Sequence, residues 1–100
     1  MQKTWLNNYA PGMPTEINPD AYASLVEIFL ESVHKYSNKP AITNLGCQLT
    51  YSEWFEKSRI FAAYLQEDCG LKKGDRFAIM LPNLLQYPVA LFGALMAGLT

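Results

Sequence analysis

The chain has 100 residues, of which 50% are hydrophobic and 17% charged, so it can build the core of about one small domain. Eight Lys and Arg residues stand against nine Asp and Glu residues, and the formal net charge is −1. Because no basic surplus attracts phosphate backbones, the composition argues against nucleic acid as a partner. Cys47 and Cys69 belong to no CxxC or Cys/His group, which argues against a disulfide scaffold and a zinc site.

The first residues predict a cytoplasmic protein and an extended arm. Residues 1–9 contain no apolar stretch and no cleavage site typical of a secretory signal, so we expect a reducing environment with both thiols free. Residues 1–20 are too rich in proline for a helix, and we interpret them as an arm preceding an α/β unit that starts at residue 21. Two roles for the arm stay open: a strap that packs Trp5 and Tyr9 onto the body, or a docking or dimerisation segment.

The middle of the chain predicts a helix, a hairpin and a second helix. The first helix begins at Ser24, where Ser24 and Glu27 have the spacing of a capping box. Residues 40–50 predict a short β-hairpin that turns at Leu45-Gly46. A second capping box, Thr50 to Glu53, opens a helix that runs to about Asp68, with Gly70 as its stop. His34 lies off the apolar stripe of the first helix, which favours a solvated surface residue over a general base.

The last quarter of the chain predicts a buried strand and a buried helix. None of residues 77–100 is charged, but Pro82 and Asn83 interrupt the run, which argues against a membrane span. Residues 77–81 are typical of a strand that is apolar on both faces, and Leu85 to Ala97 of a helix that needs cover on every side. A parallel strand after this helix would complete a βαβ unit, so we expect the unit to be cut off and the chain to be a fragment.

No catalytic, cofactor-binding or metal-binding residue is predicted within residues 1–100. There is no P-loop, no GxSxG, no HExxH and no pair of catalytic carboxylates. The turn at 81–84 has no glycine that would bring backbone N–H groups close to a phosphate. We expect Asn83 with Gln86 to cap the last helix, and the basic residues at 72–76 to form a solvated loop.

Several stretches nevertheless resemble a known enzyme class. LTYSE at 49–53, GLKKGDRFAIMLPN at 70–83 and ALMAG at 94–98 are similar to the start of acyl-adenylate-forming enzymes. A narrower resemblance, to bacterial long-chain fatty acid–CoA ligases, is carried by WLN at 5–7, PTEINPD at 14–20 and PNLLQYPVALFG at 82–93. Phe77 stands where valine is commoner in these enzymes, and we expect this to be an exchange of one apolar residue for another at a buried position. The resemblance covers essentially the whole chain.

The resemblance implies an α/β fold, with this chain as the N-terminal part of the large domain. It also implies a two-step, ATP-dependent ligase. A fatty carboxylate attacks the α-phosphate of Mg-ATP to give acyl-AMP and pyrophosphate, and the CoA thiol then displaces AMP. The family's pyrophosphate loop, adenine and metal motif and C-terminal lysine do not occur in residues 1–100. We therefore expect this part to be structural, to be inactive alone and to bind no ATP, Mg²⁺ or CoA itself.

The expected partners are fatty acid, ATP and CoA for the parent enzyme, and the remainder of its own chain for this part. A homodimer and a peripheral contact with the inner face of the cytoplasmic membrane stay open. A different function also stays open: a stand-alone binding module that uses the apolar last helix to hold a protein or lipid. The two functions differ in that a module should be monodisperse and unfold cooperatively, whereas a fragment should aggregate or form a loose globule.

Overall fold

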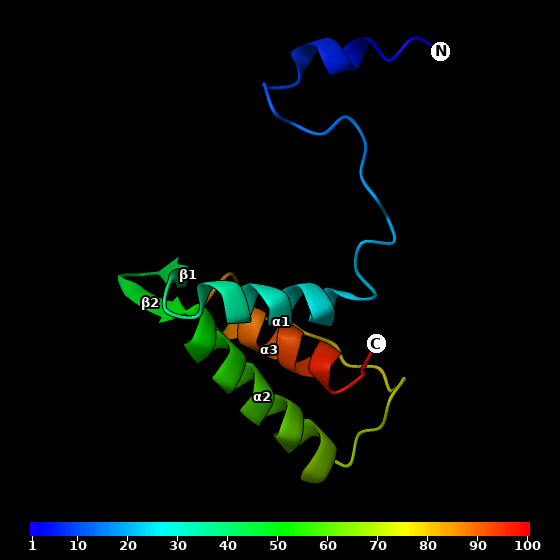
Figure 1. Ribbon diagram of the computed structural model, residues 1–100. Helices are drawn as coiled ribbons and strands as arrows, with labels where there is room; N and C mark the ends of the chain where they lie inside the picture. Colours follow the sequence, from blue (N-terminus) through cyan, green and yellow to red (C-terminus); the bar gives the residue numbers. More distant parts are fainter.

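A computed structural model describes residues 1–100 (Figure 1). Three helices and one hairpin form a body, from which the N-terminal segment extends far to one side. The elements, in chain order, are the 3₁₀-helix η1 (Thr4–Asn8), α1 (Leu25–Tyr36), β1 (Pro40–Asn44), β2 (Cys47–Thr50), α2 (Tyr51–Glu67) and α3 (Gln86–Met96). This mixture of helices with a two-stranded antiparallel sheet confirms the α/β class.

In residues 1–20 the only regular element is η1. Of the two roles left open for the arm, the strap that packs Trp5 and Tyr9 onto the body is wrong, because the arm runs away from the body and leaves these residues 47% and 40% exposed. One ion pair, between Lys3 Nζ and Glu16 Oε1 at 3.3 Å, ties the two halves of the arm together. The domain boundary at residue 20 stays a prediction.

Both predicted helix starts are confirmed by their caps. Ser24 Oγ accepts the N–H of Glu27 at 3.2 Å, and the Glu27 carboxylate accepts the N–H of Ala23. At the start of α2, Thr50 Oγ1 accepts the N–H of Glu53 at 3.2 Å, while Glu53 Oε2 accepts the N–H of Thr50 at 2.8 Å. Only the pair at α2 is a full capping box, but both caps satisfy backbone donors that have no partner inside the helix, so these four-residue patterns determine where α1 and α2 begin.

The predicted hairpin is also confirmed. Asn44 pairs with Cys47 across a two-residue turn, in which Leu45 and Gly46 have φ angles of 49° and 78°. Positive φ at both turn positions matches the right-handed twist of the flanking strands, and Gly46 adopts it without a steric penalty. The hairpin therefore leads directly into α2, whose N-cap is the last residue of β2.

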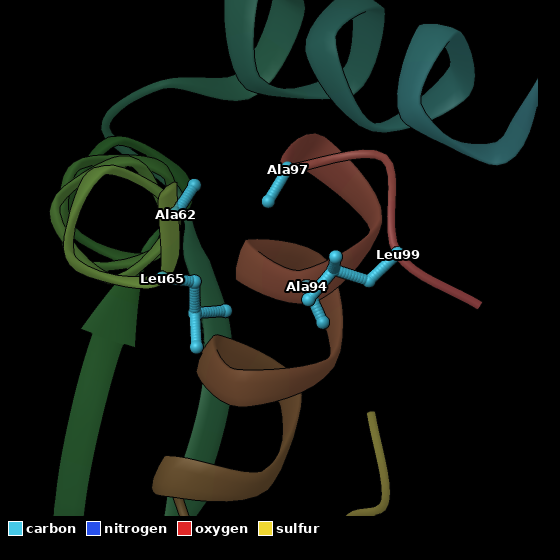
Figure 2. Close-up of a cluster of buried hydrophobic side chains, with 5 residues drawn as sticks. All are labelled: Ala62, Leu65, Ala94, Ala97 and Leu99. Carbon is cyan, nitrogen blue, oxygen red and sulfur yellow. The ribbon is translucent and has the colours of Figure 1, made fainter. Parts of the chain in front are cut away.

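The core lies between α2 and α3. Figure 2 shows its buried side chains meeting from both helices and from the segment after α3: Ala62, Leu65, Ala94, Ala97 and Leu99. Small residues dominate this cluster, so the helices approach closely, and Gly93 faces α2 with no room for a side chain. Above α2 and α3 (Figure 1), α1 contributes Phe29, whose ring centroid lies 4.5 Å from that of Trp54 and 4.5 Å from that of Phe92.

Residues 77–81 differ from the expectation. They are not assigned to a strand, and they are not fully buried: Phe77 and Ile79 are half-buried, whereas Met80 and Leu81 are 97% and 43% exposed. The apolar composition is typical of a strand that is covered on both faces. Within residues 1–100, however, no layer covers the second face of residues 77–81, and no strand pairs with most of their length. The helix that follows has the predicted extent, and only Gly93 and Ala94 within it are fully buried. No helix of this chain has the length and apolar character needed to cross a membrane.

Candidate functional site

An apolar groove with a volume of about 550 Å³ lies between α2 and α3. Its apolar lining comes from β2, α2, the segment before α3 and α3 itself: Leu49, Phe61, Leu81, Leu85, Val89 and Ala90. Lys57 and Gln86 are its only polar lining residues. A groove of this kind offers apolar contact and one ammonium group, but no nucleophile and no acid–base pair.

Sequence reasoning did not name these residues as a site. Within α3, the adjacent apolar residues Val89 and Ala90 are part of the uncharged last helix that the sequence predicts, but nothing in the sequence marks them as the wall of a groove. Leu49 and Phe61 could not have been found from the sequence either, because only the packing of the hairpin and α2 against α3 brings them to the same wall. The groove is therefore a property of the tertiary arrangement.

A second, smaller hollow of about 250 Å³ lies where the hairpin meets the segment before α3. There Asn44 Nδ2 donates a hydrogen bond to the Asn83 carbonyl oxygen at 3.1 Å. The expectation that Asn83 and Gln86 cap α3 is wrong, because Leu85 occupies the N-cap position and makes no side-chain cap. The loop is instead held by its contact with β1, which fixes the entry into α3.

The residues at 81–84 do not fit the phosphates of a nucleotide. The N–H of Leu84 already donates to the Pro82 carbonyl at 2.8 Å, and no glycine opens the turn. In the basic loop, Asp75 Oδ2 accepts the N–H of Lys72 at 2.7 Å, so a carboxylate occupies the position an anion would need. No group of three or more His, Cys, Asp or Glu side chains could hold a metal ion. No step of ATP or Mg²⁺ chemistry is assigned to these 100 residues.

The titratable groups with shifted pKa values lie on the exposed surface of α2. Arg59 donates two hydrogen bonds to the Glu56 carboxylate, at 2.6 and 3.0 Å, and this bonding lowers the pKa of Glu56 and raises that of Arg59. A hydrogen bond with Cys69 is the main cause that raises the pKa of Tyr64. Such exposed pairs are screened by water and mark helix surface rather than a reaction centre.

His34, which was considered as a general base from the sequence, and the two cysteines lie outside the groove. His34 is exposed on α1, as expected, and makes no side-chain hydrogen bond. Cys47 and Cys69 are free and exposed in this structure. The structure brings none of these three residues to the groove. The prediction that no catalytic or ligand residue lies within residues 1–100 stays a prediction.

A family model and a curated relative both relate this chain to one class of enzymes. The model of the family described as "AMP-binding enzyme" matches residues 29–100. The long-chain-fatty-acid–CoA ligase of Escherichia coli O6:H1 is 60% identical over 99 residues, which are 99% of this chain and 18% of that protein. The chain thus spans less than a fifth of the length of this relative.

Two solved structures are similar. The N-terminal subdomain of Klebsiella oxytoca NpsA has a TM-score of 0.72 and 26% identity, and the match covers 76% of this chain and 20% of the subdomain. The fatty acyl-adenylate ligase of L. pneumophila, in complex with acyl adenylate and pyrophosphate, has a TM-score of 0.61 and 28% identity, and the match covers 84% and 16% of the two chains. The body of the chain therefore has the fold found in the N-terminal parts of these proteins.

Proposed function

This chain belongs to the AMP-binding enzyme family, and we propose that it is part of an ATP-dependent ligase that converts long-chain fatty acids to acyl-CoA through acyl-AMP. The observation that carries the proposal is the 60% identity to a long-chain-fatty-acid–CoA ligase over 99 residues. This similarity includes the arm, which lies outside the matched range of the general family model. Similarity over the arm supports the narrower class.

The proposed reaction needs activation because a carboxylate is a poor acyl electrophile. Transfer of AMP to the carboxylate, with release of pyrophosphate, gives the acyl carbon a good leaving group, and the CoA thiol then displaces AMP. We propose that ATP, Mg²⁺ and CoA are all required by the complete enzyme. Since residues 1–100 contain no fitting phosphate or metal site, their ligands would come from other residues of that enzyme.

The role proposed for residues 1–100 is structural. The close packing of α2 against α3 and the aromatic contacts of Phe29 with Trp54 and Phe92 make a rigid support. The groove and the exposed residues 80–81 offer apolar surface that the remainder of the same chain would cover. A stand-alone binding module has the exposed groove in its favour, but it does not account for the identity to much longer enzymes.

Location and association are further parts of the proposal. For the location, we propose the cytoplasm. A homodimer and a peripheral contact with the inner face of the cytoplasmic membrane would both use the arm, where Met13 and Ile17 are 57% and 86% exposed. Light scattering of the complete protein tests the dimer, and flotation with phosphatidylglycerol vesicles tests the membrane contact. Deletion of residues 1–20 should abolish whichever association is real.

The experiment that tests the activity uses the complete gene product. Exchange of labelled pyrophosphate into ATP should depend on palmitate and not on benzoate, and addition of CoA should convert the adenylate to palmitoyl-CoA with release of AMP. Exchange with benzoate but not with palmitate would agree with an adenylate-forming enzyme and would contradict a long-chain fatty acid as the substrate. Absence of exchange with every carboxylate tested, in a folded protein, would contradict the ligase assignment.

A further inference from the structure

We draw no further inference here: the strongest candidate, the apolar groove between α2 and α3 with Lys57 in its lining, carries none, because nothing in the structure shows what covers it.

Discussion

Gly93→Ala is the sharpest test of the contact between α2 and α3, because two opposing terms can be set against each other. A Cβ built at Gly93 would lie 2.7 Å from Phe61 Cδ1 and 3.0 Å from the Ser58 carbonyl oxygen. Ordinary van der Waals contact is about 3.5–4.0 Å, so Phe61 or the backbone of α2 must move. Ser58 is fully buried and donates to the Trp54 carbonyl at 2.8 Å, which limits that movement.

The helix propensity of alanine favours the variant by about 1 kcal/mol relative to glycine. Overpacking of a well-packed core costs about 1–3 kcal/mol. We therefore expect Gly93→Ala to lower the free energy of unfolding by up to about 2 kcal/mol. Gly93→Val should lower it further, because valine adds two methyl groups at the same contact and has a lower helix propensity.

The assay is the thermal unfolding midpoint of the complete protein, with palmitate-dependent pyrophosphate exchange as the check that the variants are folded. The matched control is Gly93→Ala in a Phe61→Ala background. Removal of the ring relieves the shortest contact, so the alanine should then be close to neutral, with a coupling of about 1 kcal/mol between the two positions. A midpoint that rises equally in both backgrounds would refute the close approach of the two helices at Gly93.

Three further predictions concern other parts of the body. Phe92→Asp should destabilise the complete protein by about 3 kcal/mol or more, because it places a carboxylate against the rings of Phe29 and Trp54, whereas Phe92→Leu should cost about 1 kcal/mol. Thermal unfolding compares the two variants, and equal midpoints would contradict the packing. His34→Ala should leave the rate of pyrophosphate exchange within about twofold, since the side chain is exposed and far from any proposed chemistry; loss of most activity in a folded variant would contradict its surface role. The pKa of Glu56 is below its ordinary value of 4.5 in the folded chain, so its pairing with Arg59 stabilises the fold above pH 4.5, and this stabilisation is lost as the pH falls through the lowered pKa. Arg59→Gln should therefore flatten the dependence of the unfolding midpoint on pH below about 4.5. An unchanged dependence would contradict the pairing.

The sequence by itself determined the local elements of the body. Ser24 and Thr50 begin their helices because a side-chain oxygen three residues before an N–H is all that a cap requires. Leu45-Gly46 makes the hairpin turn because Gly46 accepts positive φ. The uncharged last helix was predicted in the same way, since its composition and spacing are properties of consecutive residues. The resemblance to acyl-adenylate-forming enzymes was confirmed by the AMP-binding enzyme family model, which matches residues 29–100.

Only the tertiary structure decided how these elements meet. The arm's Trp5 and Tyr9 proved to be exposed, because no pattern within residues 1–20 specifies the surface they would contact. Residues 77–81 have the composition of a buried strand, but a strand depends on hydrogen bonds from neighbours that are distant in sequence, and among these five residues only Phe77 makes one. The groove brings Leu49 close to Val89, which lies forty positions later in the chain, and the tight contact at Gly93 depends on where Phe61 and Ser58 lie. Local patterns determine where α1, α2 and the hairpin begin, whereas burial and edge pairing depend on surfaces that only the assembled fold supplies.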